Sequence, residues 1–288
     1  MKNTYILFPN INPNFISIGF ISIKWYGLAY FITLIFSLWY GKKINKKNKF
    51  VNKKYFYNLI YSCFIGLILG GRIGYILFYK FFYFLKDKFY LFKIWNGGMS
   101  FHGGLIGIIL TCFIFSKKNK QSFLKITDFI SLLSPFGLGI GRLGNFINSE
   151  LWGRIKINSS YSFLFPNSLQ YDLREIENNP KLKLIIEKYG VLPRYPSQLY
   201  EFFFEGLILF ILLLIIYKKQ KNFGITSSAF LIFYGIFRIF LEFFREPDID
   251  IGFFYKNYTA GQILSIPMIV FGFILLIILL NSKKFKKL

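Results

Sequence analysis

Long apolar stretches, separated by short basic or mixed-charge segments, dominate the hydrophobic pattern of this chain. A helix needs about 20 mostly apolar residues to cross the hydrocarbon core of a bilayer. Glycine and polar residues interrupt several stretches, which is tolerated where a helix faces protein or a cavity. The pattern predicts an all-α polytopic membrane protein, residues 1–288, with a single integral membrane domain. Its seven expected spans are roughly 18–41, 56–80, 100–116, 126–145, 199–217, 225–244 and 260–281.

The lysines predict the orientation of these spans. They cluster after the first, third, fifth and seventh spans, at Lys42–Lys54, Lys117–Lys125, Lys218–Lys221 and Lys283–Lys287. Because basic loops favour the cytoplasmic side, we expect the N-terminus outside and the C-terminus in the cytoplasm. The long polar stretch 146–198, between spans four and five, then lies outside. It is expected to form a small extramembrane head with one short helix near 179–189.

Composition supports a membrane protein and argues against nucleic-acid binding. Charged residues make up 17% of the chain, whereas a soluble domain carries about a quarter. The net charge of +23 would suggest a nucleic-acid partner in a soluble protein. Here the positive charge flanks apolar stretches, which membrane orientation explains. No nucleic acid is therefore expected among the partners.

Polar residues inside the spans are candidates for function, because a charge costs ~2.5–3.5 kcal/mol at the centre of a bilayer. Arg142 and Asn145 lie three residues apart and share a helix face. Arginine offers a planar fork of donors that suits phosphate, and asparagine adds neutral donors. We interpret Arg142 as part of a phosphate or substrate site, with a structural ion pair as the alternative. The nearby glycines fit a dinucleotide pattern, but no strand precedes them, and close helix packing explains them better.

A second polar stripe runs along the sixth predicted span. Tyr234, Arg238 and Glu242 recur every four residues and therefore lie on one helix face. Arg238 and Glu242 can pair, which lowers the cost of burying both. The pair could simply lock two helices together, but the tyrosine on the same stripe favours a lined cavity.

His102 is the only histidine in the chain and lies among glycines. A lone histidine is more often structural than catalytic, although it titrates near neutrality and the glycines would let a substrate approach. The chain has no second histidine, and Cys63 and Cys112 both lie within apolar stretches. No metal site, disulfide framework or cofactor is therefore expected.

Seven short motifs are distributed from the first predicted span to the last. The longest is Gly141–Arg154, with the sequence GRLGNFINSELWGR. The others are Trp25–Gly27, Gly70–Tyr75, Ser100–Gly104, Pro196–Glu201, Phe237–Asp248 and Gly261–Pro267. Any one could arise by chance, but the set in this order closely resembles the bacterial prolipoprotein diacylglyceryl transferases. The chain departs from that family at Tyr195, where histidine is usual, at Asn96, where aspartate is common, and at Ser149, where glycine is common.

The resemblance implies a seven-span enzyme of the bacterial inner membrane, with its site open to the outer leaflet and periplasm. It implies transfer of an sn-1,2-diacylglyceryl group from phosphatidylglycerol to the lipobox cysteine thiol of a prolipoprotein signal peptide. Glycerol phosphate is released in this first step of lipoprotein maturation. The family's important positions fall here on Tyr26, His102, Arg142, Asn145, Glu150, Gly153, Tyr234, Arg238 and Glu242. Tyr26, Glu150 and Gly153 enter through the resemblance alone.

This reaction requires a deprotonated thiol and a stabilised leaving phosphate. We expect Arg142 and Arg238 to hold the phosphate with help from Asn145, and Glu242 to orient Arg238. Tyrosines 26 and 234 would shape the pocket, and Glu150 and Gly153 would belong to the substrate-binding part. His102 is the candidate base; alternatively, the arginines lower the pKa of the thiol and no protein base is needed.

Two other functions remain open at this point. A transporter or lipid-translocating protein would use its intramembrane arginines and glutamates to line a pathway. No internal repeat is evident, which lowers the expectation of a secondary transporter. A structural membrane scaffold would instead tolerate apolar replacements of Arg142 and Arg238.

Overall fold

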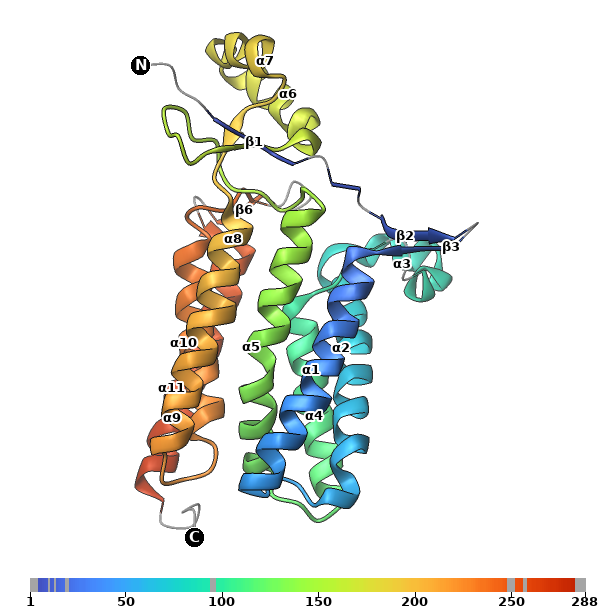
Figure 1. The fold of residues 1–288 in the computed structure, drawn as a ribbon, viewed down its shortest axis with the longest axis vertical. Helices are drawn as coiled ribbons and strands as arrows, with labels where there is room; N and C mark the ends of the chain where they lie inside the picture. The colour runs from blue at the N-terminus through green and yellow to red at the C-terminus, as the bar shows by residue number, and fades with distance from the viewer. Residues whose placement is uncertain are drawn as a thin grey trace. The chain divides into compact units, whose positions relative to one another are not determined.

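The fold is known from a computed structural model, drawn in Figure 1. It describes residues 5–9, 11–12, 14–18, 21–93, 97–247, 252–255 and 258–282. Asn96, Asp248 and the cluster Lys283–Lys287 lie outside these residues. The chain forms two compact units, each assembled from three stretches of sequence. Unit one comprises 1–33, 135–211 and 233–265, and unit two comprises 34–134, 212–232 and 266–288.

Helices occupy the positions of all the predicted spans, which confirms an all-α polytopic membrane protein. Among the described residues, five helical stretches are long and apolar enough to cross a membrane: Lys53–Tyr79, Phe101–Lys118, Phe123–Ile147, Ser197–Lys219 and Ala260–Asn281. The other two are α1 (Trp25–Asn48), of 24 residues, and the shorter apolar helix α10 (Ile225–Leu241). The prediction that the first span begins near residue 18 is wrong, because Asn14–Ile18 and Ile21–Lys24 pair as antiparallel strands β2 and β3.

In unit one, two helical spans approach each other backbone to backbone. The first is α5 (Phe123–Ile147). The second runs without interruption through α8 (Ser197–Glu201), a π-helical segment (Phe202–Ile208) and α9 (Leu209–Lys219). A Cβ atom added at Gly206 would lie 2.8 Å from the Cα of Gly139. This close contact brings the side chains one turn away on α5 within reach of the π-helical segment.

The polar stretch 146–198 folds into a small sheet with helices around it. Strands β1 (Ile6–Leu7), β4 (Phe163–Leu164) and β5 (Pro193–Arg194) are ordered β1-β4-β5, with β1 parallel to β4 and β5 antiparallel. Two helices follow β4, α6 (Leu169–Asn178) and α7 (Lys183–Tyr189). The helix expected near 179–189 is therefore present as α7, and α6 was missed.

A buried arginine fastens this sheet to α6 and to the chain beyond α10. Arg194, on β5, is fully buried, and its Nη2 atom lies 2.6 Å from Asp172 Oδ1. Its Nη1 atom lies 2.8 Å from Glu246 Oε2 and donates to the carbonyl oxygen of Gly153 at 3.2 Å. The carboxyl of Glu246 loses hydration through burial, which raises its pKa above the ordinary value despite the nearby guanidinium.

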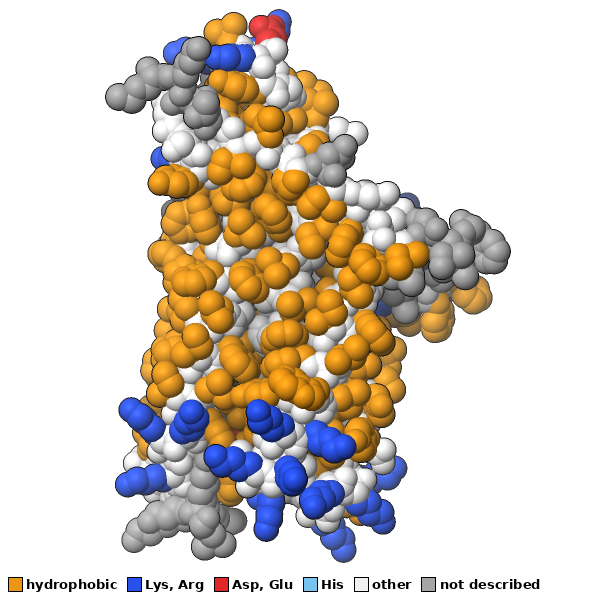
Figure 2. Space-filling model, in the orientation of Figure 1, with side chains coloured by type: hydrophobic (Ala, Val, Ile, Leu, Met, Phe, Trp, Pro, Cys, Tyr) orange, Lys and Arg blue, Asp and Glu red, His pale blue; other side chains and the backbone are white. Residues whose placement is uncertain are grey.

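In unit two, α2 (Phe56–Tyr79) packs antiparallel against α4 (Phe101–Lys118) through small residues. After α2 come the short helix α3 (Phe81–Lys86) and the turn Lys88–Phe92. Arg72 holds the end of this turn by donating to the carbonyl oxygens of Tyr90, Leu91 and Lys93. The lysines of this unit gather at the ends of its helices, beyond a broad apolar surface (Figure 2).

The α2–α4 contact predicts a specific sensitivity to added volume. A Cβ atom at Gly103 would lie 2.4 Å from the carbonyl oxygen of Gly70. Because that neighbour is backbone, Gly103→Ala should destabilise the protein by about 1–3 kcal/mol, seen as a lower midpoint of thermal unfolding in detergent. The matched control is Gly141→Ala on α5, where an added Cβ meets nothing within 4 Å. Equal midpoints for the two variants would contradict this account of the packing.

Candidate functional site

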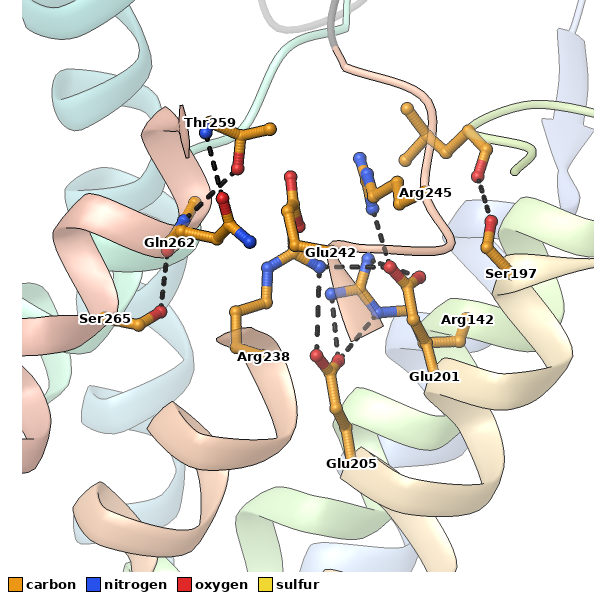
Figure 3. Close-up of polar contacts among 12 residues, drawn as sticks. Arg142, Ser197, Glu201, Glu205, Arg238, Glu242, Arg245, Thr259, Gln262 and Ser265 are labelled. Atoms are coloured by element: carbon orange, nitrogen blue, oxygen red, sulfur yellow. Dashed lines mark hydrogen bonds and ion pairs between the residues drawn. The ribbon is translucent and has the colours of Figure 1, made fainter. Parts of the chain in front are cut away.

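Six charged side chains of unit one converge into a single cluster, drawn in Figure 3. They come from α5, from the span Ser197–Lys219, from α10 and from the turn that follows α10. No side chain in the group is more than 15% exposed. The members, called here the charge cluster, are Arg142, Glu201, Glu205, Arg238, Glu242 and Arg245.

Arg142 extends from α5 and forms ion pairs with two carboxylates. Its Nε and Nη2 atoms lie 3.0 and 2.9 Å from Glu205 Oε2. Its Nη1 atom lies 3.2 Å from Glu201 Oε2. Both glutamates are fully buried and lie four residues apart, so they present adjacent carboxylates from one helix face. All three guanidinium nitrogens of Arg142 therefore contact carboxylate oxygen.

Two further arginines complete the cluster from the region of α10. Arg238 Nη1 lies 3.0 Å from Glu201 Oε1, and Arg238 Nη2 lies 2.8 Å from Glu242 Oε2. The pairing of Arg238 with Glu242 that the sequence predicted is thus present. Arg245 Nη1 also lies 3.0 Å from Glu201 Oε1. Glu201 consequently contacts arginines from three different positions in the chain.

The charge cluster is neutral as a whole, and two of its arginines converge on one carboxylate. The cluster contains three guanidinium and three carboxylate groups, so its formal charges cancel. Cancellation is what makes such burial tolerable, because an unpaired buried charge is costly. In addition, Arg142 and Arg238 reach the two oxygens of one carboxylate, that of Glu201. The two guanidinium groups therefore converge on a single anionic group.

A second polar group lies on α5 and α1 near the charge cluster. The Asn145 side chain, 4% exposed, donates from Nδ2 to Glu150 Oε1 at 3.2 Å. The Tyr26 hydroxyl donates to the same Glu150 carboxylate. Asn145 follows Arg142 by three residues on α5, so this group adjoins the charge cluster along one helix face. The structure thus brings Asn145, which its helix spacing singled out, together with Tyr26 and Glu150, which entered through the resemblance.

Gly153 lies where three segments of backbone cross. Its N–H donates to the carbonyl oxygen of Tyr195 at 2.9 Å, and it pairs in a β-bridge with Arg245. A Cβ atom here would lie 2.5 Å from the carbonyl oxygen of Phe244. Glycine is therefore required for this crossing, which fixes the turn that carries Arg245. Ser149, close by, has a φ of 50°, in the left-handed region that favours glycine.

The start of α11 (Ala260–Asn281) lies against Glu242. A Cβ at Gly261 would lie 3.1 Å from both carboxylate oxygens of Glu242. Thr259 and Gln262 cap this end reciprocally, with the Thr259 N–H donating to Gln262 Oε1 at 3.1 Å and the Gln262 N–H donating to Thr259 Oγ1 at 3.3 Å. The positive end of the α11 dipole therefore supports the negative charge of Glu242 (Figure 3).

Tyr234 and His102 complete the set of predicted residues. Tyr234, 1% exposed, lies on the face of α10 that carries Arg238. His102 lies in the first turn of α4, which Ser100 caps through its hydroxyl, and its ring packs edge-on against Phe101 at 5.3 Å between centroids. His102 belongs to unit two, whereas the charge cluster belongs to unit one. Its role as a base stays a prediction.

Sequence reasoning missed three members of the charge cluster. Glu205 is an acidic residue within the apolar stretch 199–217, and the argument that selected Arg142 should have selected it too. Glu201 entered the sequence analysis only as the last residue of the motif Pro196–Glu201. Arg245 follows the end of its predicted span, and nothing in the pattern indicated that it turns back to Glu201.

Comparison with known proteins gives one consistent answer. The family model described as prolipoprotein diacylglyceryl transferase matches residues 13–278. A phosphatidylglycerol–prolipoprotein diacylglyceryl transferase of Buchnera aphidicola subsp. Acyrthosiphon pisum is 54% identical over 273 residues, 94% of this chain and 97% of the relative. Proteins of the same name from Escherichia fergusonii and Photorhabdus laumondii are 50% and 48% identical, and each match covers 96% of this chain. The match covers 96% of the Escherichia protein and 95% of the Photorhabdus protein.

Proposed function

The chain belongs to the prolipoprotein diacylglyceryl transferase family, and we propose that its charge cluster binds the phosphate of phosphatidylglycerol during transfer. The diacylglyceryl group passes to the cysteine thiol of a prolipoprotein lipobox. One observation carries the proposal: Arg142 and Arg238, from different helices, converge on the two oxygens of the Glu201 carboxylate at 3.2 and 3.0 Å. A phosphate bound beside Glu201 would meet the same arginines through their other donors, chiefly Nε and Nη2 of Arg142.

The reaction forms one bond and breaks another at the same carbon. The thiolate sulfur attacks the glyceryl carbon that carries the phosphate, and a carbon–sulfur thioether bond forms. The carbon–oxygen bond breaks with its electron pair on the phosphate oxygen, so glycerol phosphate leaves. Negative charge therefore grows on the phosphate, where fixed guanidinium groups in a dry site stabilise the transition state most.

The remaining site residues have roles that follow from their contacts. Glu242, 2.8 Å from Arg238, orients that guanidinium. Asn145 assists phosphate binding, and its partner Glu150 holds it in place together with Tyr26. Gly153 shapes the substrate-binding part of the site by allowing three backbone segments to cross. Tyr234 shapes it through its buried ring on α10.

The membrane setting supports the same reaction. Phosphatidylglycerol is a membrane lipid, and the chain carries several helices able to cross a membrane. Membership of the family supports a location in the bacterial inner membrane, and the lysine clusters favour an N-terminus in the periplasm and a C-terminus in the cytoplasm. In that orientation 146–198 is a periplasmic head, on the side where a lipobox cysteine is modified.

A direct assay tests the proposed function. The purified protein is incubated with phosphatidylglycerol and a lipobox peptide, and the product is examined by mass spectrometry. A thioether-linked diacylglyceryl peptide is expected, and a peptide with serine in place of cysteine should gain no mass. Lipid flux across vesicles without any thioether product would overturn the proposal and favour a lipid transporter.

The role of His102 has its own test. If His102 accepts the thiol proton, His102→Gln should lower the transfer rate most near neutrality, and the loss should shrink as the solution pH approaches the thiol pKa of ~8.5. The transfer rate is measured from pH 6 to 9 for both proteins. A variant that keeps most of its rate across this range would remove His102 as the base and leave activation of the thiol by the arginines.

A further inference from the structure

Glu205 occupies the edge of Arg142 that an oxyanion would use. The Nε and Nη2 atoms of Arg142 point in parallel and lie 3.0 and 2.9 Å from the same oxygen, Glu205 Oε2. Parallel donors of this kind are the preferred guanidinium edge for phosphate. A phosphate that binds Arg142 through this edge must therefore displace the Glu205 carboxylate from it.

The displaced carboxylate has no route to water. The Glu205 side chain is 0% exposed and lies in the π-helical segment Phe202–Ile208. The next residue, Gly206, is pressed against Gly139, which holds the backbone in place. The second oxygen, Glu205 Oε1, accepts no hydrogen bond from a described residue, and Arg238 Nη1 lies 3.8 Å away. Displacement would therefore leave a buried, poorly supported negative charge.

The charge balance of the cluster also disfavours a negatively charged Glu205 once phosphate is bound. Three arginines and three glutamates cancel in the free protein. A phosphodiester monoanion would bring one negative charge into a nearly dry site, where an uncompensated charge is costly. Resting on the proposed function, we propose that the Glu205 carboxylate takes up one proton when phosphatidylglycerol binds and later gives it to the leaving phosphate. The carboxylate becomes a carboxylic acid, and the cluster with its bound phosphate stays neutral.

The other glutamates of the cluster are better held as anions. Glu201 contacts three arginines, and Glu242 lies between Arg238 and the positive end of α11. The groups that face Glu205 are Arg142 from α5, Arg238 and Tyr234 from α10, and Glu201 one turn earlier on its own helix. Once phosphate takes Arg142, the nearest cation left to Glu205 among the described residues is Arg238, 3.8 Å away, and two anions, Glu201 and the phosphate, lie beside it.

The proton is returned during the reaction. Bond breakage gives the phosphate a second negative charge, and the Glu205 proton passes to it, so that glycerol phosphate leaves as a monoanion. Glu205 is then a carboxylate again and can pair with Arg142. The thiol releases its own proton to solution. Over a complete cycle, the proton that Glu205 takes from solution leaves on glycerol phosphate, and the thiol proton replaces it in solution, so protons are conserved.

Proton uptake can be counted directly. The full-length protein, in nanodiscs of phosphatidylcholine, is titrated calorimetrically with short-chain phosphatidylglycerol in two buffers of different ionisation enthalpy. We expect uptake of one proton per lipid bound, and an apparent Kd that rises by up to about tenfold per pH unit. Glu205→Gln should bind the lipid without proton uptake and independently of pH. No uptake by the unaltered protein, or undiminished uptake by the variant, would overturn the proposal.

A second measurement identifies the residue that holds the proton. Lipid binding should add an infrared band for a protonated carboxylic acid, and Glu205→Asp should shift that band while Glu201→Asp leaves it in place. A band that moves only with Glu201→Asp would overturn the assignment to Glu205. Failure of the unaltered protein to bind lipid or form thioether contradicts the proposed function, whereas binding and transfer without proton uptake contradict this inference alone.

Discussion

Arg142→Ala is expected to lower the rate of diacylglyceryl transfer to a lipobox peptide about 10²–10³-fold, the usual effect of removing a donor that stabilises developing charge. The arginine places all three guanidinium nitrogens where the phosphate is proposed to bind. Alanine removes the positive charge and both parallel donors at once. The measurement is the initial rate of thioether formation by the purified variant in phosphatidylglycerol-containing micelles.

Two further variants make this result interpretable. Arg174→Ala makes the same change at an exposed position on α6 and should keep the full rate. Arg142→Lys keeps a positive charge but offers no planar fork, and it should recover little of the lost activity. Each variant's thermal unfolding is recorded, because the loss of Arg142 also leaves Glu205 without its closest partner. A near-normal transfer rate in Arg142→Ala would contradict the phosphate-binding role.

Arg194→Ala is expected to cause the largest loss of stability. The guanidinium is fully buried, lies 2.6 Å from Asp172 and 2.8 Å from Glu246, and fastens β5 to α6. Removing it strands the Asp172 carboxylate inside the protein, and breaking such a buried pair costs about 3–5 kcal/mol. The midpoint of thermal unfolding in detergent should fall accordingly, or the protein should fail to accumulate.

A double substitution separates lost charge pairing from lost volume. Asp172→Asn combined with Arg194→Met removes both charges of this pair while keeping similar side-chain size, and it should be more stable than Arg194→Met alone. Asn at position 172 can still accept from the backbone N–H of Leu192, which Asp172 Oδ2 does at 2.8 Å. If the double variant is no more stable than the single one, the stranded carboxylate is not the cause.

The spans were predictable because each is a long stretch of mostly apolar residues. An apolar stretch such as 260–281 must be buried in lipid or protein, and α11 begins and ends where the pattern places it. The start of the first span was not predictable in this way. Residues 18–24 are apolar enough to extend the span, yet Ile21–Lys24 pairs with Asn14–Ile18 as a hairpin. Hydropathy alone does not distinguish an apolar strand from the first turns of a membrane helix.

The candidate site was predictable one helix at a time. Spacing along α10 was enough to pair Arg238 with Glu242, because four residues make one helical turn. Contacts between helices were not available from spacing, so the partners of Arg142 could not be named. They depend on how the span Ser197–Lys219 is rotated, which the Gly139–Gly206 contact and the π-helical segment decide together. A π-helical segment leaves no reliable mark in a single sequence.

The distribution of the six charges along the chain has a consequence for biogenesis. Arg238 and Glu242 can neutralise each other as soon as α10 forms. Glu201 and Glu205 have no arginine in their own span, and Arg142 has no acid near it on α5, so each enters the bilayer unpaired at ~2.5–3.5 kcal/mol on insertion scales. Because α5 is translated before the span Ser197–Lys219, Arg142 has no carboxylate partner until Glu201 and Glu205 have been synthesised. Complete membrane integration of α5 is therefore expected to depend on α8, which begins 50 residues after α5 ends (197 − 147).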